Sequence, residues 1–261
     1  MFPPGITTLS FSEGYKKYFE IVPALSKELK WENYHLRHEV YCRDLGFEPE
    51  RSDEIETDDY DRHSLHCLIR AVTAQIYVGC ARIVLTDPED MRRPLPFEEA
   101  CVATLDRSII DPMRCDRRKI AEISRLAVLG RYRRRKGEST RPIGLDENLG
   151  EGERLRLPYL TLGLYLGLIA IARHQGIETL FVLTEPRLAA GISRLGVDVQ
   201  QIGGPIEHRG TRIPSMMNVK RIIKGLNPYV RPFFNVIAAE VEAGMNGDPS
   251  HGGGVSVAKR A

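Results

Sequence analysis

The longest apolar run in the chain, 160-LTLGLYLGLIAIA-172, constrains the fold more than any other stretch. It is interrupted by Thr and Gly, and it is shorter than the ~20 residues that cross a bilayer, so it predicts a buried helix. Pro158 suits the start of that helix and Gly176 its end. Strand-like runs flank it, 119-KIAEISRLAVL-129 before and 178-ETLFVLTE-185 after. The pattern predicts helices packed on a sheet.

The remaining segments extend this α/β pattern to a single domain over 1–244 with a mixed sheet flanked by helices. Its core spans about 17–220, a helical extension comes next at 221–244, and the Gly-rich tail 245–261 is expected to be disordered. Further strands are predicted at 18–24, 65–72, 76–85, near 197–203 and at 212–220. Further helices are predicted from Lys27 to about Leu45, within the connector 87–112, at 186–196 and at 228–244.

The charge balance argues against a protein that binds nucleic acid over its whole surface, because the formal net charge is only +2. Charges are instead concentrated locally, acidic at 54–61 and basic at 131–136. The five cysteines include no CxxC pair, which fits reduced thiols in the cytoplasm. The first ten residues do not resemble a signal peptide, and no transmembrane segment is expected.

The acidic run 54-EIETDDYD-61 has three readings. A solvated loop is the commonest fate of such a run. An EF-hand would need a central Gly that the run lacks, so calcium is not expected. The third reading pairs its carboxylates, Asp58 and Asp61, with arginines in predicted helix or strand. A strand arginine such as Arg82 is costly to bury unless it meets a carboxylate.

Glu122 lies in a strand that reads as buried. Its carboxylate is therefore either paired with an arginine or raised in pKa, and the second case suits a general base. Alternation places Glu122 and Ser124 on one face of the sheet and Arg125 on the other, unless a bulge intervenes. From the chemistry alone, a structural ion pair is the commoner outcome.

Other catalytic and metal motifs are missing from the sequence. His63, His66 and Cys67 resemble metal ligands in composition, but their spacing matches no strong zinc pattern, and no metal is expected. No GxSxG elbow, Walker loop or strand–GxGxxG–helix fingerprint occurs.

Five motifs in order carry a family resemblance: YFEIVPA, 36-LRHEVYCRDLGF-47, 56-ETDDYD-61, 79-GCARIVL-85 and 121-AEISRLAV-128. Over about 17–220 the chain resembles the acyl-homoserine-lactone autoinducer synthases and the N-acyl amino acid synthases, which have the GNAT fold. It looks most like the acyltransferases associated with PEP-CTERM/exosortase systems.

The resemblance implies roles for individual residues. Arg37, Tyr41 and Phe47 match residues of the acceptor site, and Glu122 matches the general base. Phe47 stands where autoinducer synthases have Trp, which argues against lactone formation. The substrate-binding cluster also includes Asp58, Asp61 and Arg82. The catalytic group comprises Glu122, Ser124 and Arg125, whose guanidinium belongs to the same electrostatic cluster.

The implied reaction transfers an acyl group from a phosphopantetheine thioester to an amine such as an amino acid, with no permanently bound cofactor. Backbone N–H groups from Leu126, Ala127 and Val128 onward would contact the donor where the strand splays from 178–185. An acyl tunnel would be lined by 160–171 and 181–183, although ordinary core is the commoner role for such residues.

The basic run is interpreted as a docking lip for the acyl donor, with acyl carrier protein favoured over coenzyme A because that carrier is acidic. It comprises Arg131, Arg133, Arg134 and Arg135. Two alternatives stay open: an autoinducer synthase proper, and a non-catalytic protein that binds polyanions through 131–136.

Overall fold

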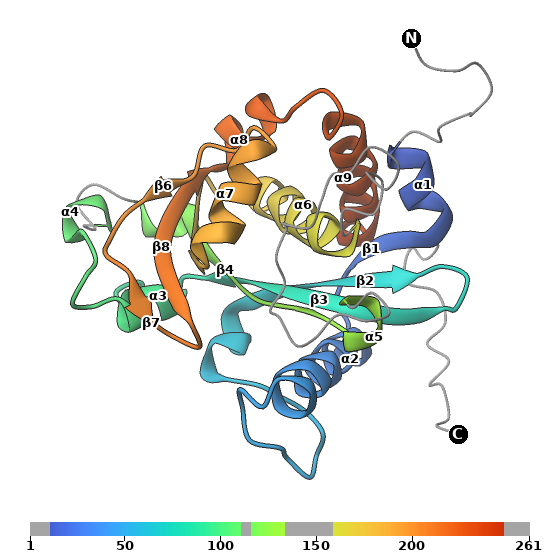
Figure 1. The fold of residues 1–261 in the computed structure, drawn as a ribbon, viewed down its shortest axis with the longest axis horizontal. Helices are drawn as coiled ribbons and strands as arrows, with labels where there is room; N and C mark the ends of the chain where they lie inside the picture. Colours follow the sequence, from blue (N-terminus) through green and yellow to red (C-terminus); the bar gives the residue numbers. More distant parts are fainter. Residues whose placement is uncertain (1–10, 111–115, 134–158, 248–261) are drawn as a thin grey trace.

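The computed structural model describes residues 11–110, 116–133 and 159–247, and these form a twisted, mixed sheet with helices on both faces (Figure 1). The strand order is β1-β2-β3-β4-β5-β8-β6, with β7 paired to β8. Neighbouring strands are antiparallel except for β4 and β5. The strands are β1 Phe19–Pro23, β2 Ser64–Ala71, β3 Ile76–Leu85, β4 Ile120–Val128, β5 Thr179–Thr184, β6 Gln200–Gln201, β7 Ile206–Glu207 and β8 Thr211–Asn218.

One face of the sheet carries the main hydrophobic core. Helix α6 (Tyr159–His174) is apolar around most of its surface and lies beside α9 (Arg231–Met245) on this face (Figure 1). A helix buried all round is what such a sequence requires. Three further helices contribute to the same core: α1 Phe11–Tyr18, α7 Pro186–Arg194 and α8 Val219–Gly225.

The opposite face carries α2 (Lys27–Arg37), the π-helix His38–Asp44 and the short helix α3 (Pro96–Ala100). The remaining short helices are Asp59–His63 and Arg117–Lys119, which are 3₁₀-helices, together with α4 Arg107–Ile110 and α5 Gly130–Arg133. A helix on each side of the sheet fits the expected α/β class, which the fold confirms.

Two irregularities interrupt the centre of the sheet. Between the register pairs Arg82–Ser124 and Cys80–Ala127, β4 contains one residue more than β3, and Arg125 in this bulge has a φ of +50°. Pairing between β4 and β5 ends at Ile123–Val182, although both strands continue beyond it. The sheet therefore opens between these two strands, as the family resemblance implied.

Several boundaries differ from the sequence-based expectation. The helix expected from Lys27 to Leu45 changes at Arg37 into a π-helix, and the strand expected near 197–203 contains only Gln200–Gln201. Helix α1 was not predicted, and α8 begins at Val219, inside the strand expected at 212–220, before it continues into the expected helical extension. The predicted helix start at Pro158 and most of the 245–261 tail lie outside the described residues, whereas Gly176 ends α6 with a φ of +70°, as expected.

Candidate active site

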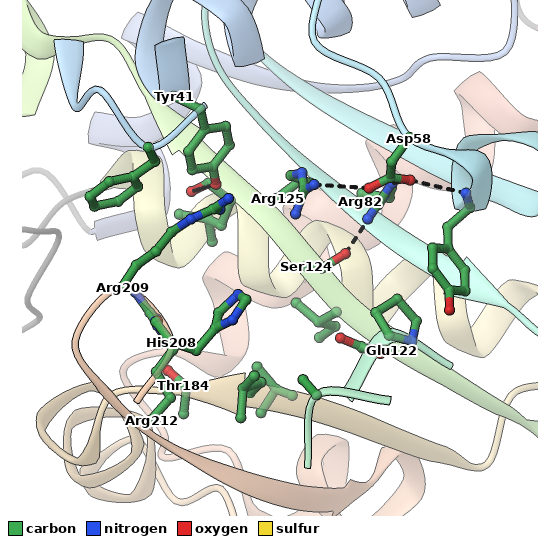
Figure 2. Close-up of a pocket in the computed structure, with 18 of the residues that line it drawn as sticks. Tyr41, Asp58, Arg82, Glu122, Ser124, Arg125, Thr184, His208, Arg209 and Arg212 are labelled. Carbon is green, nitrogen blue, oxygen red and sulfur yellow. Dashed lines mark hydrogen bonds and ion pairs between the residues drawn. The ribbon is translucent and has the colours of Figure 1, made fainter. Parts of the chain in front are cut away.

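A cavity of about 1030 Å³ lies on the α2 side of the sheet, over the opening between β4 and β5. Most of the residues predicted for the site line it or support it (Figure 2). Its lining combines charged, aromatic and apolar side chains: Tyr41, Leu45, Phe47, Asp58, Asp59, Tyr60, Arg82, Arg93, Pro96, Glu99, Ala100, Glu122, Ile123, Ser124, Arg125, Leu126, Tyr165, Val182, Leu183, Thr184, Glu185, Leu188, His208, Arg209 and Arg212.

Glu122 forms part of the cavity wall and is 3% exposed. Its Oε2 accepts a hydrogen bond of 2.8 Å from the backbone N–H of Phe97. Burial raises the pKa of Glu122 to about 8, although the Phe97 N–H and the charge of Arg82 act in the opposite direction. Among the described residues no basic side chain lies within 4 Å of this carboxylate. The structural ion pair considered from sequence is therefore not what holds Glu122.

A buried ion pair supports the segment that holds Glu122. Arg117 binds both carboxylate oxygens of Glu98, at 3.1 and 2.9 Å, and also the carbonyl oxygen of Arg93 at 2.8 Å. Glu98 in turn accepts the backbone N–H of Leu95 at 2.7 Å. A helix of five residues has little stability of its own, so this pair helps to hold α3 and its Phe97 N–H beside Glu122.

The predicted pairing of loop carboxylates with arginines is present, and it begins at Arg37. This side chain has no exposed area and binds Glu56 at 2.5 Å and Asp61 at 2.7 Å. Burial alone would raise the pKa of Asp61, but the charges of Arg37 and Arg82 hold that pKa well below its ordinary value. Both acids are therefore ionised, and the acidic run is fixed to the fold by these two buried carboxylates rather than being a fully solvated loop.

Arg82 and Arg125 carry the network to the cavity (Figure 2). Arg82 binds Asp58 at 2.6 Å and Asp61 at 2.8 Å, while its Nε donates to the Ser124 hydroxyl at 3.1 Å. Arg125 binds Asp58 at 2.9 Å. Alternation alone would have sent Arg125 to the other face, and the β4 bulge turns it toward the same carboxylates.

Tyr41 connects the π-helix to the bulged strand. Its hydroxyl donates to the Leu126 carbonyl oxygen at 2.8 Å, and the Arg125 guanidinium lies 5.8 Å from its ring centroid. The hydroxyl thus provides a hydrogen-bond partner for a carbonyl group of β4 beyond the last residue that pairs with β5. π-helical turns often mark functional sites, since the extra residue re-aims a side chain.

A second set of cavity residues was not predicted, and it comes from the turn between β7 and β8. Arg209 forms an ion pair with Glu48 and lies over the ring of Phe47, 5.6 Å from its centroid. Phe47 and Arg209 both line the cavity, so these contacts join the segment after the π-helix to the β7–β8 turn beside it. His208 and Arg212 line the same wall (Figure 2). A basic turn in 206-IEHRGTR-212 was the available sequence signal.

Glu56, Tyr165 and Thr184 were also missed as single residues, although Glu56 lies within the acidic run and Tyr165 within the predicted helix. Glu56 completes the Arg37 pair and also accepts from Arg125 at 3.3 Å. Nothing local in the sequence distinguishes Tyr165 or Thr184 from core.

The predicted donor-binding residues divide into two groups. Leu126 lines the cavity, whereas the side chains of Ala127 and Val128 are buried in the core. Leu129 N–H donates to Val78 on β3, so alternation directs the Val128 N–H away from β3, toward the open side. Arg131 is exposed and lies over Tyr132. The Arg133 side chain and the residues Arg134 and Arg135 lie outside the described part.

The predicted acyl tunnel is not open along its expected length. Leu162, Leu166 and Ile169 border an apolar void with a volume of about 20 Å³. Most of the stretch 160–171 is ordinary core. Phe181 packs instead against Phe97 on the other face, with ring centroids 4.6 Å apart.

Neither metal binding nor a membrane span finds support in the described ranges. They contain no group of three or more His, Cys, Asp or Glu side chains placed to hold a metal ion. Burial lowers the pKa of His66 to about 3. No helix within these ranges has the length and apolar character needed to cross a membrane.

Comparison with known proteins agrees with this architecture. Residues 36–141 match the family model of the acetyltransferase (GNAT) domain. No curated protein matches the chain significantly. The fold is similar to that of TofI, in a ternary complex with an inhibitor and MTA, at 17% identity and a TM-score of 0.54, covering 81% of this chain and 98% of TofI.

Two further structures share the fold. MesI, described as a CoA-dependent acyl-homoserine lactone synthase, has 19% identity and a TM-score of 0.54, with 82% of this chain and 94% of MesI covered. FeeM, an N-acyl amino acid synthase from uncultured soil microbes, has 12% identity and a TM-score of 0.51, with 82% and 97% covered. The fold is therefore that of the GNAT acyltransferases, and the enzyme class expected from the sequence agrees with the domain match.

Proposed function

We propose that this chain is an N-acyltransferase that moves an acyl group from a phosphopantetheine thioester to the amine of a small acceptor, with Glu122 as general base. The observation that carries the proposal is the state of Glu122, a cavity-lining carboxylate whose pKa is raised to about 8. A general base works best when its pKa lies near the working pH. An ordinary carboxylate would be too weak to deprotonate an ammonium group.

The acceptor fits the α2 side of the cavity. An incoming ammonium group would meet Glu122 there, and its positive charge would favour the ionised carboxylate. The Arg–carboxylate network around Asp58 holds that wall rigid, since each of its members is bound to at least one other. Arg209 and Arg212 on the opposite wall offer guanidinium groups to an acceptor carboxylate. These features favour an amino acid as acceptor.

The donor fits the opening between β4 and β5. Strand edges that diverge leave backbone N–H groups without a partner strand, and Val128 presents one toward this side. Such a group suits a hydrogen bond to the pantetheine amide or the thioester oxygen. The carrier, whether coenzyme A or acyl carrier protein, would approach the basic segment that starts at Arg131. An association with PEP-CTERM/exosortase systems remains part of the proposal.

The reaction forms one bond and breaks another. Glu122 takes one proton from the bound ammonium group, the neutral amine nitrogen then attacks the thioester carbonyl carbon, and the carbon–sulfur bond breaks to release a thiolate. No covalent enzyme intermediate is required. The second nitrogen proton passes to the thiolate through water and Glu122 returns its proton to solvent, so the products are an amide and a free thiol.

The test uses the full chain with octanoyl-coenzyme A and, separately, octanoyl-loaded acyl carrier protein, each with a mixture of amino acids and S-adenosylmethionine. Thiol release and mass spectrometry of the acylated product identify donor and acceptor together. Glu122→Gln should abolish both signals while the protein stays folded. An acylated lactone from S-adenosylmethionine would instead identify an autoinducer synthase, and an undiminished Glu122→Gln would exclude the base assignment.

Glu240→Gln is a matched control for that substitution. Glu240 is also a carboxylate whose pKa burial raises, to about 7, and it accepts a backbone N–H bond, from Ile21 at 2.9 Å. It lies on α9, where it also accepts from the Tyr15 hydroxyl, and it does not line the cavity. Its loss should leave acyl transfer intact.

A further inference from the structure

Two buried hydroxyl groups meet at the opening between β4 and β5. Tyr165, on α6, is 7% exposed, and Thr184, the last residue of β5, is 2% exposed. Both line the large cavity. Within the described residues the Thr184 hydroxyl forms no hydrogen bond of full geometry, but it lies within hydrogen-bonding range of the Tyr165 hydroxyl and lowers the pKa of that phenol. Proton transfer to Glu122 uses neither group.

These hydroxyls reach the cavity from the side opposite Glu122. Glu122 and Phe181 are register partners and contact the α3 side, whereas Ile123 and Val182 belong to the α6 core. Alternation places Thr184 with Val182, on the α6 side. Pairing ends at Ile123–Val182, so Tyr165 can extend from α6 into the gap between the strands. The gap thus has a carboxylate on one side and hydroxyls on the other.

Tyr165 also marks a change of polarity. Its side chain lines both the large polar cavity and the small apolar void bordered by Leu162, Leu166 and Ile169. A chain that passed from one space to the other would place its polar end group beside the phenol. An acyl thioester has this arrangement, with a carbonyl next to an apolar chain.

A buried hydroxyl without a partner costs about 1–3 kcal/mol. Packing alone would be served by Val at 184 and Phe at 165, which have the same shapes without the cost. The presence of two hydroxyl groups at this point of the cavity wall indicates that a polar group of a ligand binds there. The phenol can donate one hydrogen bond and the Thr184 hydroxyl can orient it.

We propose that Tyr165, oriented by Thr184, donates a hydrogen bond to the thioester carbonyl oxygen and stabilises the negative charge that develops there when the amine attacks. This inference rests on the proposed acyl transfer and adds a second catalytic group to it. The electron pair of the carbonyl moves to oxygen as the carbon–nitrogen bond forms, and it returns as the carbon–sulfur bond breaks. Tyr165 keeps its proton throughout.

The pKa values of the Tyr165 phenol and of the leaving thiol show whether Tyr165 acts as a hydrogen-bond donor or as a general acid. Burial raises the pKa of Tyr165 well above its ordinary value, although the Thr184 hydroxyl and the charge of Arg212 act in the opposite direction. An ordinary cysteine thiol has a pKa of about 8.5, and the leaving thiol is likewise much more acidic than this phenol. Proton transfer from this phenol to the thiolate would therefore be strongly uphill. A neutral phenol is suited to donate a hydrogen bond without giving up its proton.

The kinetic test compares Tyr165→Phe and Thr184→Val with the unchanged protein, using octanoyl-coenzyme A and the acceptor that mass spectrometry identifies. Removing one oxyanion donor lowers kcat by ~10²–10³-fold in known cases, so Tyr165→Phe should lower kcat by about two orders of magnitude and leave KM for the donor unchanged. The rise of activity with pH, set by Glu122, should persist. The double variant should lose little more than Tyr165→Phe, because the two groups act together.

Tyr15→Phe is the matched control, since Tyr15 is fully buried and lies away from the cavity, where its hydroxyl donates to Glu240. A second measurement needs no turnover. A dethia analogue of octanoyl-coenzyme A keeps the carbonyl and cannot transfer it, and its infrared carbonyl band should shift to lower frequency on binding. Tyr165→Phe should abolish that shift, whereas Tyr15→Phe should retain it.

Unchanged kcat in Tyr165→Phe, an effect on donor KM alone, or an unshifted carbonyl band in the unchanged protein would each overturn the inference. Failure of the proposed acyl transfer itself would give a different result from failure of the role of Tyr165. In that case the unchanged protein would release no thiol with any amine, whatever the infrared result.

Discussion

The backbone N–H of Phe97 points at the carboxylate of Glu122 and donates to it at 2.8 Å. A hydrogen bond from a backbone group is fixed in direction, so it holds the carboxylate in one orientation toward the cavity. It also stabilises the ionised form, which burial opposes. The protonation state of Glu122 therefore depends on where α3 places a single N–H group.

Glu122→Gln should stabilise the folded protein at high pH relative to the unchanged chain. The pKa of Glu122 is about 8 in the folded state against 4.5 for an ordinary Glu, so the folded state holds the proton more tightly. Its contribution to the free energy of unfolding is fully present below pH ~4.5 and is lost as the pH rises to about 8. Denaturant unfolding at several pH values should show that the free energy of unfolding of the variant increases relative to that of the unchanged protein between these limits. A constant difference would contradict the burial of this charge.

Activity should rise with pH through an apparent pKa of about 8 in kcat/KM, because only the ionised Glu122 can accept a proton. Replacing Phe97 by its α-hydroxy analogue turns the amide into an ester and removes only the N–H donor. A hydrogen bond to a charged group is worth ~1.5–3 kcal/mol, so the apparent pKa should move up by about 1–2 units. The same ester at Phe233, which lies in the remote core, is the control. An unmoved profile would exclude Glu122 as the titrating group.

Arg37→Met should destabilise the fold by about 3–5 kcal/mol, because it removes the fully buried partner of Glu56 and Asp61. Of the described arginines, Glu56 would keep only the longer contact with Arg125, and Asp61 only Arg82. Arg43→Met is the control. Arg43 also contacts two carboxylates at 2.5 Å, those of Glu39 and Glu54, but all three are partly exposed. An exposed pair contributes ~0–1 kcal/mol. Denaturant midpoints compare the two variants, and equal losses would show that burial does not govern this network.

The network should also make the protein sensitive to acid. The pKa values of Asp58 and Asp61 lie below their ordinary values: burial opposes this, but the arginine partners outweigh it. Their contribution to stability is present above pH ~4 and is lost as the pH falls through the lowered folded-state values. Neutralising Arg37 should remove much of this dependence. An acid titration followed by circular dichroism, in which Arg37→Met kept the slope of the unchanged protein, would contradict the assignment.

The sequence was sufficient for the sheet and for the partners of the network. Alternating and continuous apolar runs place β1 to β5 and α6 within one or two residues, since burial determines those patterns. The arginines in predicted helix and strand required carboxylates, and the acidic run supplied them. These inferences depend on local pattern and on the cost of buried charge, both of which can be read along the chain.

Other features depend on contacts that no local pattern specifies. The π-helix at His38–Asp44 and the bulge at Arg125 each add one residue to a regular element, and nothing in their side chains distinguishes the resulting turn. The N–H of Phe97 has no side-chain signature at all. The bridge between Glu48 and Arg209 joins segments 161 residues apart, so only the folded sheet brings them together.

Arg209→Ala should weaken acceptor binding more than it weakens the fold. Arg209 lines the cavity from the β7–β8 turn, pairs with Glu48 and lies over Phe47. Both charged side chains are partly exposed, at 28% and 26%, so the pair should contribute no more than ~1 kcal/mol to unfolding. The substitution removes the ion pair with Glu48 and also the guanidinium group proposed to bind the carboxylate of the acceptor. KM for an amino acid acceptor should therefore rise by about tenfold, which corresponds to ~1.4 kcal/mol, with donor KM unchanged. Arg221→Ala, which breaks a more exposed pair with Asp198, should change neither constant. If donor KM rose instead, the bridge would belong to the thioester side of the cavity, and the acceptor would have to be placed elsewhere.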